Sequence, residues 1–230
     1  MKITVFRYNP QTEDEPRYET YEIEHHPHMK IIDALQQINE RYGANIAYRS
    51  SCRAGQCGSC AVLANRKPVL ACRTDVVEGM LLEPLRNFPV IKDLVVATQK
   101  NYPRVRALRP YLHRGKKREA RIEKLLPEEL RRLEKLKSCI ECSSCMSSCP
   151  SHTHSKEFAG PMLFRIIARF VHDPRDKLNR LPIAVEEGLY LCTTCGTCRE
   201  VCPEEIPTNE EIQEMRRLVY EGSNSLGEAE

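Results

Sequence analysis

The stretch Cys139-Ile-Glu-Cys-Ser-Ser-Cys-Met-Ser-Ser-Cys-Pro150 determines how the second half of this 230-residue chain is interpreted. Its spacing, C-x2-C-x2-C-x3-C-P, recurs in Cys192-Thr-Thr-Cys-Gly-Thr-Cys-Arg-Glu-Val-Cys-Pro203. In bacterial iron–sulfur sequences with two such runs, three cysteines of each run bind one cluster and the cysteine before proline binds the other. The spacing therefore predicts a single domain that binds two cubane-type clusters.

The crossed pairing assigns eight cysteines to these two clusters. One [4Fe–4S] cluster is expected to bind Cys139, Cys142, Cys145 and Cys202. The other is expected to bind Cys149, Cys192, Cys195 and Cys198. Because four thiolates are available to this last cluster, it is predicted to be [4Fe–4S] as well. The alternative is a [3Fe–4S] cluster with Cys195 as a spectator.

The remaining four cysteines have a different spacing, Cys52-x4-Cys57-x2-Cys60, with Cys72 after eleven further residues. This matches the plant-type [2Fe–2S] pattern. Gly55 and Gly58 lie inside the loop, where glycine permits positive φ and close approach of the backbone to sulfur. Zinc sites are the alternative for all three groups, but neither this spacing nor a cysteine before proline is typical of zinc.

Hydrophobic patterning predicts an α+β protein. Strands at 3–8 and 17–24, a helix at 29–42 and a hairpin at 61–72 predict an N-terminal β-grasp [2Fe–2S] ferredoxin domain. Helical patterns at 127–136, 161–171 and 209–221 predict a mainly helical domain around the other cysteines. The expected domains are 1–98 and 127–230, joined by a basic connector at 99–126.

Composition narrows the classes of function. A net charge of +3 and the absence of tryptophan do not favour nucleic-acid binding. No apolar run is long enough for a membrane helix, and Met1 to Tyr8 has no apolar signal region. The connector is either a solvated linker or a docking patch for an acidic partner or anionic lipid. His152 and His154, which follow the Cys149-Pro150 pair, are a polar loop or a candidate acceptor site.

The chain resembles the iron–sulfur subunit of succinate dehydrogenase and fumarate reductase. The segments that carry the resemblance are 49–60, Leu70-Ala-Cys72, 90–96, Cys139-Ile-Glu-Cys142, Cys149-Pro-Ser151, Gly160-Pro161 and the final Cys-Pro run. The resemblance implies a separate FAD-bearing partner that interconverts succinate and fumarate. It also implies that this chain is non-catalytic and relays electrons through three clusters to a membrane-anchor partner and a quinone. The expected location is cytoplasmic, peripheral on the inner face of the membrane.

Two features depart from the usual family pattern. Most members lack a cysteine equivalent to Cys195, and a tryptophan and a histidine usually contribute to their quinone site. Here tryptophan is absent and Thr193 follows Cys192. These departures are similar to an atypical branch with a four-cysteine third cluster. The alternatives are an iron–sulfur subunit of a thiol:fumarate or heterodisulfide-type reductase, with a thiol acceptor, and a structural metal-binding scaffold.

Overall fold

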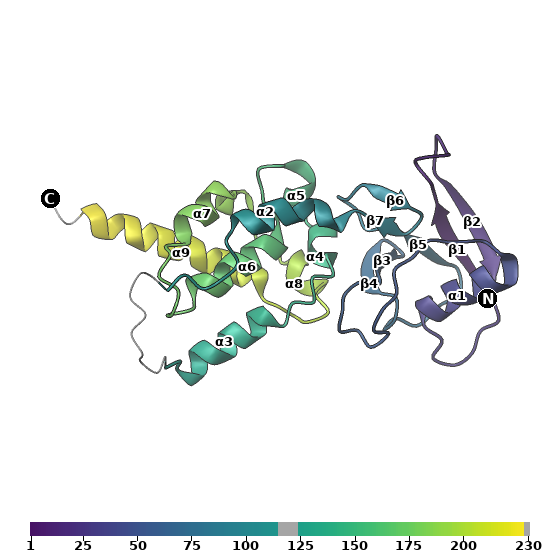
Figure 1. The fold of residues 1–230 in the computed structure, drawn as a ribbon, viewed down its shortest axis with the longest axis horizontal. Helices are drawn as coiled ribbons and strands as arrows, with labels where there is room; N and C mark the ends of the chain where they lie inside the picture. The colour runs from purple at the N-terminus through teal and green to yellow at the C-terminus, as the bar shows by residue number, and fades with distance from the viewer. Residues whose placement is uncertain (115–123, 228–230) are drawn as a thin grey trace. The chain divides into compact units, whose positions relative to one another are not determined.

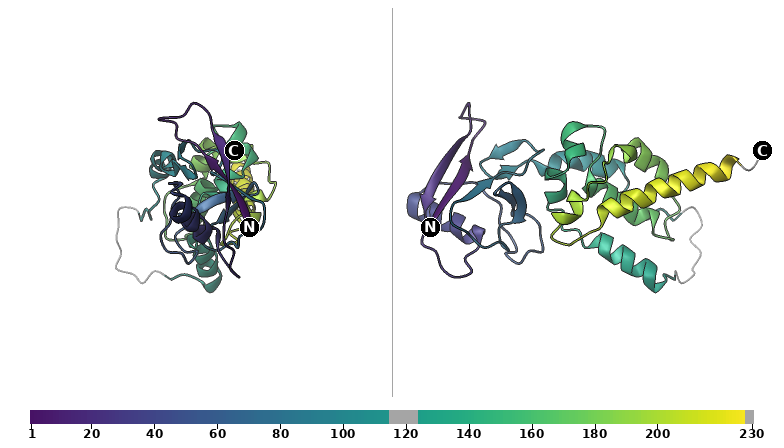
Figure 2. Two further views of the ribbon diagram at one scale, coloured as in Figure 1. Left: turned by 90° about the vertical axis from the view of Figure 1, so that its right-hand side faces the viewer. Right: turned by 180° about the vertical axis from the view of Figure 1, so that it is seen from behind.

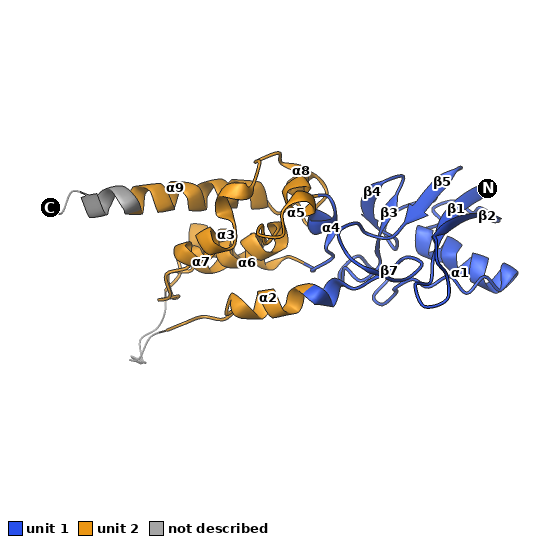
Figure 3. Ribbon diagram, turned by 90° about the horizontal axis from the view of Figure 1, so that it is seen from above, with its two compact units in different colours: residues 1–100, 140–148 blue, residues 101–139, 149–230 orange. Residues whose placement is uncertain are grey.

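The computed structural model describes residues 1–114 and 124–227, which form two compact units (Figures 1 and 3). Unit 1 comprises residues 1–100 and 140–148, and unit 2 comprises residues 101–139 and 149–230. The segment 140–148 belongs to the second domain by sequence but packs with unit 1. The domain boundaries at 98 and 126 therefore stay a sequence prediction, and the units are the observed division.

A five-stranded mixed sheet, with strand order β2-β1-β5-β3-β4, forms the centre of unit 1. β1 is antiparallel to β2, with Lys2 opposite Glu22, and parallel to β5. A short antiparallel pair, β6 and β7, forms a second sheet. The strands are β1 Lys2–Arg7, β2 Arg17–Glu22, β3 Ala61–Ala64, β4 Lys67–Leu70, β5 Met80–Glu83, β6 Val90–Lys92 and β7 Val95–Val96.

Helix α1, Ile31–Tyr42, buries Ile31, Leu35 and Ile38, as its sequence period predicts. It ends at Gly43, whose φ of 59° is the left-handed conformation that closes many helices. Strand β1 shows the alternation expected of a strand, with Ile3 and Val5 fully buried. The predicted N-terminal α+β domain is confirmed, although the sequence patterns did not indicate β5.

A buried ion pair ties the chain before the first cysteine loop to the sheet. The carboxylate of Asp93 accepts hydrogen bonds from Arg7 Nε at 3.1 Å, from the Tyr8 amide at 3.1 Å and from the Ala47 amide at 2.9 Å. Arg7 also donates to the Ala44 carbonyl at 2.8 Å. Because both charged side chains are buried, each needs the other's hydrogen bonds to remain in place.

Unit 2 is helical, and α6 is its central element (Figures 1 and 2). Nine of the eleven residues of α6 are buried, and the helix packs against α3, α7 and α9. The predicted helices near 127–136, 161–171 and 209–221 are present. The helices of this unit are α2 Tyr102–Ala107, α3 Pro127–Lys137, α5 Pro150–His154, α6 Pro161–Val171, α7 Leu181–Glu186, α8 Thr197–Glu200 and α9 Thr208–Gly227, with 3-10 turns η1 Thr98–Asn101, which crosses the unit boundary, and η2 Leu189–Leu191.

In the described part of the basic connector, Arg104 makes contacts within unit 2. Arg104 pairs with Glu187 at 2.5 Å and donates to the carbonyl of Glu157 at 2.6 Å. Lys116, Lys117, Arg118 and Arg121 lie in 115–123, outside the described residues. Within the described ranges, no helix combines the length and apolar character that a membrane span requires.

Glu211 joins three helices of unit 2. This buried carboxylate of α9 accepts from Arg132 of α3 at 2.8 Å, and His172 Nε2, at the end of α6, lies 2.8 Å from it. Burial acts to raise the pKa of Glu211, but its contacts with His172 and Arg132 outweigh burial and lower the pKa. The ionised form of Glu211 is therefore stabilised by folding.

We expect Glu211→Gln to lower the free energy of unfolding by about 1.5–3 kcal/mol at pH 7, the range for hydrogen bonds to charged groups. Because the folded-state pKa of Glu211 is lowered, its contribution is present above the ordinary glutamate pKa and is lost as pH falls through the folded value. Urea unfolding measured from neutral to acidic pH should therefore show the free energies of unfolding of the wild-type protein and of Glu211→Gln converging at low pH.

The matched control is Glu210→Gln, one residue away. Glu210 pairs with Arg199, but both side chains are more than half exposed, so its loss should change stability little. Acid loss of any bound cluster is common to all variants and cancels in the comparison at each pH. Equal destabilisation by the two substitutions would contradict this role of Glu211.

Candidate iron–sulfur cluster sites

The first cysteine loop, 52–60, folds its backbone around the sulfur of Cys52. The amides of Ala54 and Gln56 both lie 3.4 Å from Cys52 Sγ. Gly55, between them, has a φ of 73°. Amides that point at a sulfur stabilise negative charge on it, which is the arrangement that a thiolate ligand of iron needs.

The β3–β4 hairpin brings the other end of this loop to Cys72. Ala61 pairs with Leu70 in the hairpin, and the Ala71 amide donates to the Cys60 carbonyl at 3.1 Å. Cys60 and Cys72, on either side of the hairpin, are both buried. Burial raises the pKa of the Cys60 thiol to about 11, whereas hydrogen bonds from Ser59 and from the Cys52 backbone lower that of Cys57 to about 6.

The backbone at Gly58 packs directly on the segment 140–142, which belongs to the same unit. A Cβ at Gly58 would lie 2.3 Å from the Ile140 carbonyl oxygen and 2.9 Å from Cys142 Cα. Segment 140–148 is held there by hydrogen bonds from the Arg86 amide to Ser147 Oγ at 2.8 Å and from Asn87 Nδ2 to the Met146 carbonyl at 2.9 Å. Only glycine allows this close contact between two cysteine-bearing segments.

The second cysteine set is divided between the units. Cys142 and Cys145 lie in unit 1, beside and within the short helix α4, Ser144–Ser147. Cys139 and Cys202 lie in unit 2, at the ends of α3 and α8. Their assignment to one cluster continues to depend on the spacing of the runs.

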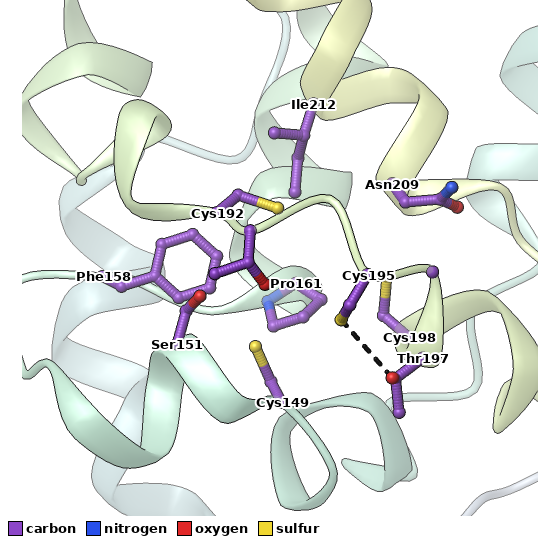
Figure 4. Close-up of a pocket in the computed structure, with 12 residues that line it drawn as sticks. Cys149, Ser151, Phe158, Pro161, Cys192, Cys195, Thr197, Cys198, Asn209 and Ile212 are labelled. Atoms are coloured by element: carbon purple, nitrogen blue, oxygen red, sulfur yellow. Dashed lines mark hydrogen bonds between the residues drawn. The ribbon is translucent and has the colours of Figure 1, made fainter.

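The third cysteine set lines a single cavity of unit 2 (Figure 4). Cys149 reaches it from the start of α5, Cys192 and Cys195 from the loop between η2 and α8, and Cys198 from α8 itself. The cavity is small and partly open to solvent. Phe158, Pro161 and Ile212 form an apolar part of its wall, and Ser151, Thr193, Gly196, Thr197 and Asn209 complete the lining.

The acid–base properties of these four thiols differ. Burial raises the pKa of Cys149, and raises that of Cys198 to about 12. Burial also acts to raise the pKa of Cys195, but hydrogen bonds, chiefly from Thr197, outweigh it and lower the pKa. Four soft sulfur donors around one small cavity fit the ligand set of a cubane-type cluster.

His152 and His154 lie on α5, and neither lines this cavity. His152 Nδ1 is 3.2 Å from the Phe158 carbonyl, and burial lowers the pKa of His152. A neutral imidazole in this arrangement donates from Nδ1, which leaves Nε2 as an acceptor. His154 is exposed at the end of the helix. Ser151, from the same helix, is the residue that faces the cysteines.

Three hydroxyl groups beside the cysteines were not identified from the sequence. Ser59 Oγ lies 3.1 Å from Cys57 Sγ, Ser144 Oγ lies 3.3 Å from Cys142 Sγ, and Thr197 Oγ1 lies 3.4 Å from Cys195 Sγ. The signal was available in the sequence, because a C-x-[S/T]-C motif occurs once in each of the first two cysteine groups and twice in the third.

Two family models match the chain. Residues 2–102 match a "2Fe-2S iron-sulfur cluster binding domain", and residues 135–206 match a "4Fe-4S dicluster domain". The two matches together contain all twelve cysteines.

Known proteins resemble the chain over most of its length. It is 48% identical over 229 residues to a subunit of the fumarate reductase (CoM/CoB) of Methanothermobacter marburgensis, which covers 98% of this chain and 46% of that protein. It is 34% identical to the "Fumarate reductase iron-sulfur subunit" of Haemophilus influenzae, which covers 90% of this chain and 88% of that protein. The chain thus spans less than half the length of the Methanothermobacter relative.

A solved structure has the same fold. A chain of the "Mycobacterium smegmatis Sdh1 complex in the apo form" superposes with a TM-score of 0.88 at 28% identity, covering 96% of this chain and 95% of that one.

The Gly58 contact gives a direct test of the first site. Gly58→Ala places a Cβ 2.3 Å from the Ile140 oxygen, where ordinary contact begins at 3.4 Å, so the segments must separate by about 1 Å. We expect Gly58→Ala to lower the thermal midpoint and the acid-labile sulfide content of the purified protein.

Gly79→Ala is the control, because Gly79 has a similar φ of 71° and nothing within 4 Å of the added Cβ. It carries only the backbone strain, roughly 1–2 kcal/mol. If both variants lose stability and sulfide equally, the contact with 140–142 is not what requires glycine at position 58.

Proposed function

Because the chain belongs to the family of iron–sulfur subunits of fumarate reductase and succinate dehydrogenase, we propose that it binds three clusters and relays single electrons within such a complex. The observation that carries the proposal is the arrangement of its cysteines. Four of them lie in and after a loop with [2Fe–2S] spacing in a ferredoxin-type sheet domain, and four others line a cavity in a helical unit.

The proposed [2Fe–2S] ligands are Cys52, Cys57, Cys60 and Cys72. Support comes from the amides that point at Cys52 and from the hairpin that places Cys60 and Cys72 on its two sides. The match of residues 2–102 to a 2Fe-2S domain agrees with this set.

The proposed second and third ligand sets follow the crossed pairing. Cys139, Cys142, Cys145 and Cys202 would bind one [4Fe–4S] cluster, in agreement with the match to a dicluster domain. Cys149, Cys192, Cys195 and Cys198 would bind the other. Since Cys195 lines the same cavity as the other three cysteines, a spectator role is disfavoured and a [4Fe–4S] cluster is favoured over [3Fe–4S].

The proposed partners supply the steps that this chain lacks. Interconversion of succinate and fumarate moves two electrons and two protons, so a FAD-bearing partner would exchange the electron pair with substrate. When bound, the clusters accept and release one electron at a time. The residues of this chain would hold the clusters and shield them in part from solvent. We assign no residue of this chain to chemistry on the substrate. A membrane-anchor partner would place the chain on the inner face of the membrane.

The acceptor is a quinone or a thiol pair. The usual tryptophan and histidine of the quinone site are absent, and Thr193 lines the third cavity. The Methanothermobacter relative, 48% identical, has CoM/CoB, two thiol coenzymes, in its name. These observations favour the thiol alternative as a second candidate function.

Assay of the co-purified complex tests the function and its acceptor. We expect fumarate reduction by the complex, with clusters in this chain that reduce and reoxidise during turnover when followed by EPR. A quinol and the CoM/CoB thiols should be supplied separately as electron donors. Activity with thiols alone would select the thiol candidate, activity with quinol alone would select the quinone, and clusters that stay oxidised during turnover would reject the relay.

The type of the third cluster is tested by Cys195→Ala. We expect the oxidised wild-type protein to lack a stoichiometric [3Fe–4S] EPR signal and the variant to gain one, because the fourth thiolate is removed. Thr194→Ser, which leaves all four thiols in place, should behave as wild type. A stoichiometric [3Fe–4S] signal in the wild-type protein would contradict the assignment of four cysteine ligands to the third cluster.

A further inference from the structure

One local arrangement occurs three times in the chain. In three of its four C-x-[S/T]-C motifs, a hydroxyl oxygen lies within 3.1–3.4 Å of the sulfur of the first cysteine. These three motifs are Cys57-Gly-Ser-Cys60, Cys142-Ser-Ser-Cys145 and Cys195-Gly-Thr-Cys198, one in each proposed cluster site. In the fourth, Cys192-Thr-Thr-Cys195, the hydroxyl of Thr194 donates to the Thr193 carbonyl instead.

The backbone that produces the contact is also the same. The residue after the first cysteine has positive φ in every case, with values of 66° at Gly58, 65° at Ser143 and 81° at Gly196. This left-handed residue turns the chain so that the next side chain returns toward the preceding sulfur. Ser143 adopts the conformation without the freedom of glycine, which indicates that the turn itself is required.

The surrounding folds do not explain the repetition. The first motif lies in a loop next to a β-sheet, whereas the other two lie at the starts of the short helices α4 and α8. Serine and threonine at helix starts commonly cap backbone amides. However, Ser144 and Thr197 each follow the N-cap residue, and among the described residues the hydrogen-bond partner of each hydroxyl is a cysteine sulfur and not a backbone amide. The feature shared by the three hydroxyls is the cysteine sulfur.

The direction of these hydrogen bonds is set by the state of the cysteine. A free thiol can donate its proton to the hydroxyl oxygen, but a cysteine that binds iron is a thiolate with no proton. The hydroxyl must then donate to sulfur. Such a bond is stronger when the cluster carries more negative charge, so it favours the reduced cluster.

We propose that Ser59, Ser144 and Thr197 are positioning residues that each donate an O–H···S hydrogen bond to a cluster ligand and raise the reduction potential of that cluster. The proposal rests on the proposed assignment of Cys57, Cys142 and Cys195 as ligands. In each reduction the cluster gains one electron from the reductant, and the hydroxyl proton stays on its oxygen. The chain thus adjusts the reduction potentials of three clusters independently through the same local hydrogen bond.

Redox titration of the intact, cluster-loaded protein tests the proposal. Dithionite titrations followed by EPR should be run on Ser59→Ala, Ser144→Ala and Thr197→Val. Each variant should make the potential of its own cluster more negative and leave the other two unchanged. The expected size is on the order of tenfold in the one-electron equilibrium constant, which corresponds to about 59 mV.

Two further variants separate tuning from structure. Thr197→Ser keeps a hydroxyl at the same position and should restore the wild-type potential. Ser51→Ala removes an exposed hydroxyl next to Cys52 for which the described residues show no contact with a cysteine sulfur, and it should shift nothing. Iron and acid-labile sulfide should be measured for every variant.

Three results would overturn the proposal: shifts no larger than that of Ser51→Ala, equal shifts of all three clusters in each variant, or loss of the cluster itself, since a hydroxyl that only tunes is not needed to hold it. A wild-type protein that binds no iron would instead reject the proposed function. The two failures are therefore distinguishable.

Discussion

Four sulfur atoms have to converge on one small volume at each cluster site, and the segments that carry them are too short to form a core. The rest of the structure supplies the rigidity. In unit 1 the β3–β4 hairpin lies between Cys60 and Cys72, and in unit 2 the start of α5, the loop before α8 and α8 itself bring four cysteines to one cavity. Metal–thiolate bonds would add folding free energy to both units.

Buried charges hold the elements that carry these segments. Asp93 and Arg7 connect β1 with the chain that precedes the first cysteine loop. Glu211 connects α9 with α3 and with the end of α6. Such pairs add little net stability compared with apolar packing, but leaving one partner uncompensated is costly. They therefore specify where each helix and strand must lie.

The chemistry of the sites is set at short range. Amides surround Cys52, hydroxyls contact Cys57, Cys142 and Cys195, and burial raises the pKa of Cys149 and Cys198. Sulfur ligands that look equivalent in the sequence thus have different surroundings. Hydrogen bonds and exposure are the main means by which a protein adjusts an iron–sulfur cluster.

The sequence by itself determined the three cysteine groups through their spacing, and the ferredoxin-type first domain and helical second half through the hydrophobic pattern, because ligand spacing and hydrophobic period are local properties. It did not reveal β5, a four-residue strand that lies between β1 and β3, because its place depends on partners distant in the chain. Only the tertiary structure placed 140–148 against Gly58 and Cys195 in one cavity with Cys149. Those contacts join residues far apart in sequence, and backbone packing and side-chain burial decide them.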